Sequence, residues 1–305
     1  MKLRYLATSL VVLLSLSAQA QQSASLPFLF TNPDVRTSAL GDVTVMQDKG
    51  MSLYTDAYGL LSRDGKIEAN YSLGIQPTKD FGARYFNTLA LGYKLADRHA
   101  LMGGFRSMQA PKISIVSQNG TLGTLYPSDY SLDLGYAYLF MPQLSAMVRM
   151  SYLNSYVGTY ADGFSGSIAL SWHDSCQSLK YAVAGSVNNI GPKMNYKPTS
   201  SSAQLPTDFR LSAKVDFDLA EDHDLSVGAG YSRIFMSQTN TLGIGVDYDW
   251  KDALHLRTGF IHAPQNNYWT VGAGYDYKCI SFDLSYRYSK IQNLSWIGFG
   301  LGFNL

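Results

Sequence analysis

The sequence predicts an all-β fold, an antiparallel transmembrane β-barrel of about 14 strands with an N-terminal hatch segment in its lumen. Three observations lead to this fold class: an export signal at the start of the chain, apolar residues that alternate with polar or small ones over most of its length, and the pattern at its end. From Ile297 to Leu305, every second residue is apolar and the residues between them are Gly or Asn. A strand with lipid on one side and a lumen on the other has this two-residue period.

The first twenty residues have the features of a removable secretory signal. Lys2 and Arg4 form a short basic region, an apolar run follows from Leu6 to Leu16, and Ala18-Gln19-Ala20 is a small-residue cleavage site. The apolar run is shorter than the roughly 18 residues that a membrane helix needs. We therefore expect this signal to be removed, so that the mature chain begins near Gln21.

Composition supports a barrel and argues against other classes. Beyond the signal, no run approaches the roughly 18–20 apolar residues of a membrane helix, and the remaining way to satisfy every backbone polar group in lipid is a closed barrel. The chain has 22 Tyr and 27 Gly but only 15% charged residues, as expected for strands flanked by aromatic girdles. The formal net charge of +1 argues against a nucleic-acid partner, which usually requires a basic face.

The alternation of apolar and polar residues repeats from Lys66 onward and defines the strands. It is clearest from Tyr130 to Phe140, where Tyr, Leu and Phe mostly alternate with Ser, Asp, Gly and Ala. The predicted strands, in order, are Lys66–Ile75, Arg84–Leu95, His99–Ser107, Tyr130–Phe140, Gln143–Leu153, Phe164–His173, Leu179–Asn189, Asp208–Leu219, His223–Arg233, Thr239–Trp250, Ala253–His262, Asn267–Tyr277, Ile280–Ser289 and Trp296–Leu305.

The links between these strands predict their orientation. Short links, such as Met141–Pro142 and Lys251–Asp252, alternate with generally longer ones, namely Met108–Asp129, Asn154–Gly163 and Ile190–Thr207. Outer-membrane barrels have short periplasmic turns and longer extracellular loops, and an even strand number places both termini in the periplasm. A soluble β-sandwich or propeller would also show regular turn signals, but frequent Tyr residues at strand ends and Gly residues opposite them favour lipid and a lumen.

Residues 21–65 do not show the alternation. We therefore expect them to form a separate hatch segment, between a signal at 1–20 and a barrel at 66–305. A segment of this size is too small to fold around a core of its own. We expect it in the lumen, where inward polar groups satisfy its backbone. The residues assigned to the hatch and lumen are Asp34, Arg36, Asp42, Arg210 and Lys214. The inward charges are of mixed sign. This favours a network that holds the hatch in place, rather than a solute path or a ligand site.

Three groups of motifs together resemble one family. Pro27-Phe28-Leu29, Pro33-Asp34-Val35-Arg36 and Ala39-Leu40-Gly41-Asp42 form the first group, residues 188–196 (NNIGPKMNY) the second, and residues 205–211 (LPTDFRL) the third. In order and approximate spacing they resemble the PorV/PorQ family of outer-membrane barrels, relatives of the FadL fatty-acid channels. The chain departs from that family at Thr55-Asp56-Ala57, where relatives carry Asn-Pro-Ala. The resemblance implies a FadL-like barrel in the bacterial outer membrane and a role in type IX secretion.

No catalytic constellation stands out in the sequence. The five His residues lie in different strands or turns without the close spacing of metal ligands, and no Gly-x-Ser-x-Gly elbow joins a strand to a helix. We therefore predict a non-enzymatic protein with no cofactor and no bound metal. Cys176 and Cys279 fall on turns far apart around the predicted barrel, which favours free thiols over a disulfide.

Two long loops are candidates for a partner surface. The loops Met108–Asp129 and Ile190–Thr207 carry apolar and aromatic residues on the side predicted to face out of the cell. These candidate partner-binding residues are Ile113, Ile115, Leu122, Leu125, Tyr126, Met194, Tyr196 and Leu205. The alternative, equally open at this point, is that the loops pack against one another over the barrel mouth.

Three functions are compatible with these features, all with outer-membrane lipid around the barrel. The resemblance implies a docking or shuttle component of type IX secretion that binds cargo C-terminal domains, the secretion translocon or attachment-complex subunits. A FadL-like transporter of hydrophobic small molecules would instead need a path past the hatch and an opening in the wall, for which Gly103-Gly104 or the pair Gly228 and Gly230 are candidates. The third is an accessory subunit of another outer-membrane complex.

Overall fold

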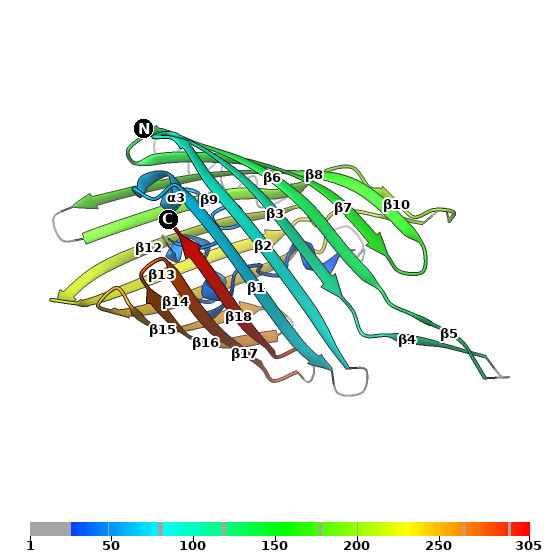
Figure 1. Cartoon of the computed structure of the whole chain (residues 1–305). Coiled ribbons are helices and arrows are strands. Elements are labelled where there is room, and N and C mark those ends of the chain that lie inside the picture. Colours follow the sequence, from blue (N-terminus) through cyan, green and yellow to red (C-terminus); the bar gives the residue numbers. More distant parts are fainter. Residues whose placement is uncertain are drawn as a thin grey trace, which may run out of the picture.

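The chain forms a closed antiparallel barrel (Figure 1). The computed structural model describes residues 26–47, 49–78, 82–117, 120–176, 179–199, 201–264, 266–291 and 294–305. The expected export signal, residues 1–20, lies outside the described residues. In the part of the chain that is described, no helix is long and apolar enough to cross a membrane.

Within the described residues, fourteen strands make up the barrel. In chain order they are β1 (Ile67–Thr78), β2 (Gly82–Ala96), β3 (His99–Gln109), β6 (Ser128–Met141), β7 (Leu144–Tyr156), β8 (Tyr160–Cys176), β9 (Leu179–Ile190), β12 (Asp208–Ala220), β13 (His223–Ile234), β14 (Thr239–Trp250), β15 (Leu254–Ala263), β16 (Asn266–Tyr277), β17 (Ile280–Ser289) and β18 (Trp296–Asn304). Strands that follow one another around the barrel are paired, and β18 pairs with both β17 and β1, which closes it. The predicted fold class is confirmed, and each predicted strand matches one of these.

The pairing register explains the alternation in the sequence. β1 and β18 place Tyr71 opposite Leu301 and Ser72 opposite Gly300. The first pair is exposed on the outside of the barrel, whereas Ser72 is buried in the lumen. Because successive side chains of a strand point to opposite faces, apolar side chains face outward around the barrel and small or polar ones face inward. An outward apolar band of this kind matches a membrane's hydrocarbon layer.

Aromatic side chains lie on the outside of the barrel near both of its ends. Near the end that holds the C-terminus are Tyr93, Tyr138, Trp172, Trp250 and Tyr277, and near the other end are Tyr85, Tyr130, Tyr152, Trp269 and Tyr286. Aromatic rings with a polar group favour the boundary between lipid and water. These two girdles therefore mark the part of the wall that spans the membrane.

The two ends of the barrel differ in their connections. The short-turn end holds the C-terminus and tight turns such as 97–98 and 251–253. The long-loop end holds the segments 110–127 and 191–207. The first of these contains a separate two-stranded sheet, β4 (Ile113–Ser117) with β5 (Gly120–Leu125), which projects beyond the barrel and is called the arm below (Figure 1). The second contains the small sheet of β10 (Met194–Asn195) and β11 (Ser202–Ala203).

One of the predicted long loops is wrong. The segment Asn154–Gly163 is mostly strand, because β7 runs to Tyr156, β8 begins at Tyr160, and the register pairs these two residues. Residues 157–159 alone form the turn. Asp162, which interrupts the apolar pattern, is held on the outer wall by hydrogen bonds from the Tyr152 hydroxyl and the Asn154 side chain, each 2.7 Å long.

The segment before β1 lies in the lumen and is called the hatch (residues 26–65; Figure 1). Its short helices are η1 (Pro27–Leu29), α2 (Val35–Ala39), η2 (Thr44–Met46) and α3 (Tyr58–Ser62). Their apolar side chains join three buried clusters that also contain inward residues of the wall. The hatch members of these clusters are Leu26, Phe28 and Leu29; Leu40, Val43, Val45 and Met46; and Met51, Leu53, Tyr54, Ala57, Leu60 and Leu61. The hatch therefore uses the wall as its core.

Candidate functional site

Arg36 is the main charged anchor between the hatch and the wall. Helix α2 begins after Asp34, whose carboxylate accepts two backbone N–H groups, including that of Arg36, and so caps the helix. Arg36 Nε lies 2.6 Å from Asp283 Oδ2 on β17. Arg36 is only 4% exposed. Burial alone would lower its pKa, but the carboxylates of Asp283, Asp34 and Asp276 outweigh this effect and raise the pKa above its usual value. Arg36 is therefore a permanent buried cation.

The wall charges around this anchor are paired as well. Arg257 lies 2.6 Å from Asp283 and 3.4 Å from Asp247, so two guanidinium groups share the Asp283 carboxylate. On the long-loop side of the hatch, Asp42 pairs with Arg287 of β17. The hatch residues that the sequence singled out, Asp34, Arg36 and Asp42, thus all lie in contacts that fix the hatch. Buried charges need such partners, because an unpaired one carries a large desolvation penalty.

A second anchor holds the hatch against β3, β6 and β7. The Tyr54 hydroxyl donates a 2.7 Å hydrogen bond to Asp133, which also pairs with Arg106 at 3.0 Å. The guanidinium groups of Arg106 and Arg149 lie 4.9 and 5.2 Å from the centre of the Tyr54 ring, within cation–π range. Sequence reasoning identified the inward charges but missed Tyr54, because the hatch has no periodicity that could mark it.

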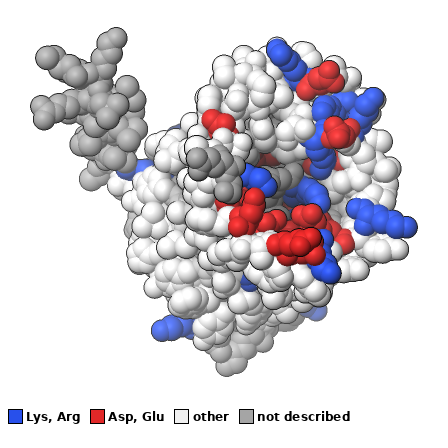
Figure 2. All heavy atoms as spheres, turned by 90° about the vertical axis from the view of Figure 1, so that its left-hand side faces the viewer, with Lys and Arg blue, Asp and Glu red and all other residues white. Residues whose placement is uncertain are grey.

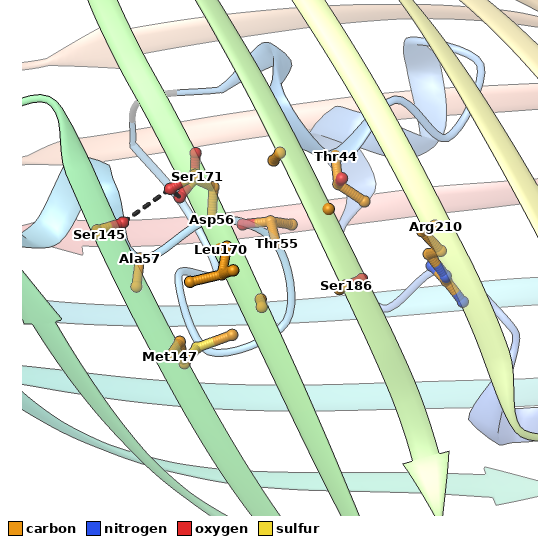
Figure 3. A pocket seen from close by; sticks show the side chains of 13 residues that line it. Thr44, Thr55, Asp56, Ala57, Ser145, Met147, Leu170, Ser171, Ser186 and Arg210 are labelled. Carbon is orange, nitrogen blue, oxygen red and sulfur yellow. Dashed lines mark hydrogen bonds between the residues drawn. The ribbon is translucent and has the colours of Figure 1, made fainter. Parts of the chain in front are cut away.

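Asp56 forms a third anchor, beside Ser145 and Ser171 of the wall (Figure 3). It accepts a 2.7 Å hydrogen bond from the Ser171 hydroxyl and lies 2.6 Å from His173 Nε2. The His173 ring stacks on Tyr58 with centroids 3.8 Å apart. Burial would raise the pKa of Asp56, but the hydrogen bond and the charge of His173, the Tyr58 N–H and the Ser171 hydroxyl together lower it below the usual value. This contact lies where the chain departs from the family motif.

The cavity beside Asp56 is too small for a substrate. It encloses about 10 Å³ between the hatch and the wall of β7 to β9 (Figure 3). Thr55, Ser145 and Ser171 are among the residues that line it. A volume of roughly 10–15 Å³ holds one water molecule. The Asp56 cluster therefore holds the hatch in place and offers no room for chemistry on a ligand.

We expect Asp56→Asn to weaken the hatch at neutral pH and to reduce its sensitivity to acid. Because the folded-state pKa of Asp56 is below its ordinary value of 3.8, the stabilisation is fully present above that value and is lost as pH falls through the lower, folded-state pKa. Hydrogen bonds to a charged group contribute about 1.5–3 kcal/mol. Urea unfolding of the lipid-reconstituted barrel between neutral and acid pH measures both effects. The control is Asp97→Asn, which changes an exposed residue in a turn. An acid profile identical to that of the unmodified protein would contradict the role of Asp56.

All three motif groups meet at one junction. β9 carries a register shift against β8, and the extra residue lets both Asn188 and Asn189 reach Asp208. Their side-chain amides donate to the two Asp208 oxygens at 3.1 and 3.2 Å, and Arg210 pairs with the same carboxylate at 2.8 Å. Asn189 also donates to the Leu29 carbonyl of the hatch at 3.4 Å. The motifs therefore encode the contact between hatch, β9 and β12.

Lys214 and Arg210 both point into the lumen from β12, as their spacing predicts. Lys214 is buried, and its Nζ lies 3.2 Å from Asp216 on the same strand. Arg210 is paired with Asp208, as described above. Both cations thus have carboxylate partners on the wall itself, in contrast to Arg36, whose partners join two separate parts of the chain.

Above the hatch, the long-loop end contains a larger cavity of about 880 Å³. Phe30, Asn32 and Asp42 of the hatch form part of its lining, and the rest comes mainly from β12 to β18, β1 and β2. Arg287 lies between the rings of Tyr268 and Trp296, 5.5 and 5.4 Å from their centres. Ligand pockets typically have volumes of about 300–1,000 Å³, so the cavity has the size of a binding pocket.

The candidate partner residues of the first loop lie on or next to the arm. Ile113 is 52% exposed, Ile115 48% and Tyr126 64%, and Leu125 is half-buried. Leu122 belongs to β5, but its side chain lies outside the described part of the structure. The arm thus presents apolar side chains to its surroundings.

The structure corrects the expectation for the second loop. Met194 and Leu205 are 0% and 1% exposed, and Tyr196 is half-buried and packs against the same cluster. This cluster includes Leu26 and Phe28 of the hatch. The loop 191–207 folds back over the barrel mouth because the apolar end of the hatch needs a cover from water. Of the two alternatives left open by the sequence, packing over the mouth therefore applies to this loop.

The glycines considered for a wall opening lie in unbroken strand pairing. Gly103 and Gly104 pair in register with β2 and β6, and Gly228 and Gly230 pair with β12 and β14. A Cβ atom on Gly104 would collide with Tyr54 of the hatch. Gly104, Gly228 and Gly230 face inward and make room for the hatch, whereas Gly103 lies on the outer face with open space around it. The pairing leaves no gap beside any of them.

The remaining candidate chemical groups are isolated. Within the described residues, no three His, Cys, Asp or Glu side chains are placed to hold a metal ion. Cys176 is exposed, Cys279 is half-buried, and both are free. The polar groups of the lumen instead pair with the hatch and with one another.

The closed barrel, its apolar outer band and its aromatic girdles define a bacterial outer-membrane β-barrel, with lipid around it. A family model described as "Type IX secretion system protein PorV" matches residues 16–241. The chain therefore belongs to the PorV family, a family of type IX secretion. No curated protein sequence matches it.

Solved structures of similar fold are hydrocarbon channels. The toluene transporter TbuX of Ralstonia pickettii matches 90% of this chain and 99% of its own length at 12% identity, with a TM-score of 0.59. The toluene transporter TodX of Pseudomonas putida matches 94% and 99% at 11% identity, again with a TM-score of 0.59. The monoaromatic hydrocarbon channel CymD matches 92% and 98% at 10% identity, with the same TM-score. At these identities the likeness shows a shared fold.

Proposed function

We propose that this protein is a non-enzymatic docking component of type IX secretion. In this proposal the short-turn end and both termini face the periplasm, and the long-loop end faces out of the cell, as in other outer-membrane barrels. The observation that carries the proposal is the arm, which projects beyond a barrel whose lumen is occupied by a firmly anchored hatch. Membership of the PorV family supplies the secretion context.

The arm has the physical features of a docking element. A two-stranded hairpin on its own is marginally stable in water. Among the described residues, β4 and β5 pair only with each other, and Ile113 and Ile115 are exposed. Unpaired strand edges and exposed apolar side chains are both features that a protein partner covers, by adding a strand or by packing on the apolar face.

The barrel wall beside the arm extends this surface down to the membrane. β7 and β8 continue past the aromatic girdle to Tyr156 and Tyr160, whose rings lie 4.5 Å apart. Tyr160 and Val157 are exposed there. Because this surface continues into the lipid-facing wall, it fits a partner embedded in the same membrane, such as the secretion translocon. Cargo C-terminal domains and attachment-complex subunits are the alternatives that the experiment separates.

Replacing the apolar residues of the arm should separate the protein from its partner. The triple variant Ile113→Ser/Ile115→Ser/Tyr126→Ser removes these residues. We expect native-membrane pull-down with this variant to recover about tenfold less, or still less, of a very large translocon barrel, because buried apolar and aromatic anchors dominate interface energy. Cargo should then remain unprocessed in the periplasm. Heat-modifiable gel migration should stay unchanged, because the substituted residues lie outside the barrel strands.

A matched control uses exposed apolar residues in other loops of the same end. Phe235→Ser/Ile291→Ser removes two such residues away from the arm and should leave both pull-down and cargo processing intact. Capture of cargo domains without the translocon would assign the arm to cargo. Normal cargo display in the arm variant would reject the proposal.

Transport of hydrophobic small molecules is a second candidate, favoured by the cavity of about 880 Å³ and by the hydrocarbon channels of similar fold. The closure of the barrel and the buried anchors of the hatch oppose passage through it. Uptake of fatty acid or toluene by liposomes that contain the purified protein would favour transport, and the docking function predicts none.

A further inference from the structure

The cavity of about 880 Å³ at the long-loop end has charged residues that neither docking by the arm nor hydrocarbon transport requires. Three arginines line it, Arg84 from β2, Arg210 from β12 and Arg287 from β17, together with two carboxylates, Asp42 and Asp208. Among the described residues, no Lys, Glu or His belongs to this lining. Arg84 is exposed, so the cavity is open to solvent on this side. A dissolved ligand therefore meets an excess of positive charge.

Two of the arginines are held in place and still have donors for a ligand. Arg287 pairs with Asp42 through Nη2, and its guanidinium lies between two aromatic rings. Arg210 pairs with Asp208 through Nε. Among the described residues, Nη1 of Arg287 and both Nη atoms of Arg210 have no hydrogen-bond partner, and unlike Nε of Arg287 they are not buried. A ligand can therefore reach these donors without breaking the pairs that hold them.

Arg84 is the third cation, and no carboxylate neutralises it. Within the described residues its guanidinium makes no ion pair and no hydrogen bond. The register places Arg84 opposite Gln76 of β1, and Arg287 opposite Trp296 of β18. Since β1 and β18 lie between β2 and β17, Arg84 and Arg287 are about 14 Å apart along the wall, at roughly 4.8 Å per strand. This spacing suits an extended ligand.

The rest of the lining shows that hydrocarbon is a poor match. Gln76 of β1, Ser232 of β13, Thr241 of β14 and Asn266 of β16 bring hydroxyl and amide groups from several sides of the cavity. A hydrocarbon would cover these groups and the arginines without replacing their hydrogen bonds to water, which costs free energy. Hydroxyl and amide groups both donate and accept. The lining therefore suits a ligand that itself carries many hydroxyl groups.

A peptide also fits this cavity less well than a sugar. One common way to bind a peptide is to add it as a strand at a free sheet edge. The strands that line most of the cavity, β12 to β18 with β1 and β2, are each paired on both sides, so the backbone of a peptide would depend on side chains alone. A sugar ring has hydroxyl groups at its edge and apolar faces that can pack on a ring such as that of Tyr268.

The other end of the barrel is less favourable for an anion. Figure 2 faces the short-turn end and shows Asp and Glu residues beside Lys and Arg residues around its mouth. The anchored hatch separates this end from the cavity. An anion therefore meets carboxylates at the short-turn end and an excess of arginines at the long-loop end, and the difference directs it to the cavity.

We propose that the cavity binds an acidic saccharide. Its carboxylate or phosphate groups contact Arg84 and Arg287, because guanidinium groups form charge-assisted, bidentate hydrogen bonds with such anions. Its hydroxyl groups contact the polar lining. In the orientation given above, the site faces out of the cell, where the saccharide is either soluble or the sugar portion of a glycolipid. The residues of the arm do not line the cavity, so this inference goes beyond the docking function.

The experiment compares an acidic with a neutral sugar by isothermal titration calorimetry of the purified protein in neutral-lipid nanodiscs. The probes are a hyaluronan tetrasaccharide, which carries carboxylates, and chitotetraose, which is uncharged. We expect the acidic probe to bind at least about tenfold more tightly, as close charge pairs contribute at interfaces. Its binding should weaken between about 50 and 500 mM NaCl.

A matched pair of variants tests the site itself. Arg84→Met should weaken binding of the acidic probe about tenfold and leave any binding of chitotetraose unchanged, because it removes one charge and no structural contact. Lys193→Met removes an exposed cation of the same end that does not line the cavity, and it should change the affinity by less than about twofold. Heat-modifiable gel migration checks that both variants fold.

The source of the saccharide can be identified with the same assay. Lipopolysaccharide added to the nanodiscs should compete with the tetrasaccharide if a glycolipid supplies the ligand, and should leave its binding unchanged if the ligand is a soluble saccharide.

Three results would overturn the inference. Absence of measurable binding of the acidic probe would reject the site. Equal losses in Arg84→Met and Lys193→Met would show that the probe follows net charge alone. Dodecanoate that binds in the cavity more tightly than the tetrasaccharide and displaces it would assign the cavity to hydrocarbon chains. The arm variant should bind the probe like the unmodified protein, so failure at this site is distinguishable from failure of the docking function.

Discussion

Replacing Arg36 by Met is expected to lower the free energy of unfolding by about 3–5 kcal/mol, the range for removing one partner of a buried ion pair. The variant leaves Asp283 with Arg257 alone and leaves Asp34 beside it without its nearest cation. The hatch should then loosen, because Arg36 joins α2 to β17. Urea unfolding of the lipid-reconstituted barrel measures the first effect, and limited proteolysis of the hatch measures the second.

Two further variants separate the buried charge from a general effect of losing an arginine. Arg84→Met removes an exposed Arg at the long-loop end and should change stability by less than about 0.5 kcal/mol. Arg36→Lys keeps the charge but loses the planar fork of donors. Its loss in free energy of unfolding should therefore lie between those of Arg36→Met and Arg84→Met. If Arg36→Met and Arg84→Met were equally stable, Arg36 would not be the anchor described here.

Gly41→Val is expected to displace the hatch and open the barrel to ions. Gly41 has a φ of 65°, a conformation that is strained for Val, at about 1–3 kcal/mol. A Cβ atom there would also collide with the carbonyl of Ile244 in β14, and a backbone cannot give way as a side chain can. The hatch backbone lies directly on the wall at this point, so the added side chain has no space. Single-channel recording in planar bilayers should show conductance absent from the unmodified protein.

Gly103→Val is the matched control for this experiment. Gly103 has open space around the position of a Cβ atom and lies in a paired strand. Val is favoured in strands, so this variant should remain closed. Conductance in both variants would indicate damage to the barrel wall. If neither variant conducts, the hatch accommodates the Val side chain at position 41 and stays in place, which would contradict the prediction.

The strands could be predicted from the sequence because lipid imposes the same requirement on each of them. Every strand must present apolar side chains outward, and the inward positions are mostly small or polar, so the period of two survives around the whole barrel. The pattern misled only where it was weak. Asp162 looks like a loop residue, yet it lies on the outer wall beyond the girdle, where water and the Tyr152 hydroxyl can reach it.

The contacts of the hatch could be predicted only in part. The inward position of Arg210 and Lys214 follows from strand periodicity, but periodicity gives no information on which hatch residue meets which wall residue. Tyr54 and Asp56 therefore remained unrecognised. The pairing of His173 with Asp56 could not be predicted either, because the two residues are 117 apart in sequence. The burial of Met194 and Leu205 was missed for the same reason, since their contacts with Leu26 and Phe28 are tertiary.

The distance in sequence between the hatch and its main anchor restricts the order of assembly. Arg36 and Asp283 are 247 residues apart, and Asp42 and Arg287 are 245 apart, so the hatch, which precedes β1, binds to the penultimate strand. Contacts this distant form late, after the intervening chain has been ordered. The leading segment can thus be seated only once synthesis and insertion are almost complete. Chains truncated before β17 would carry this segment without a place to bind, and the machinery that inserts the barrel must keep the lumen accessible until β1 and β18 join.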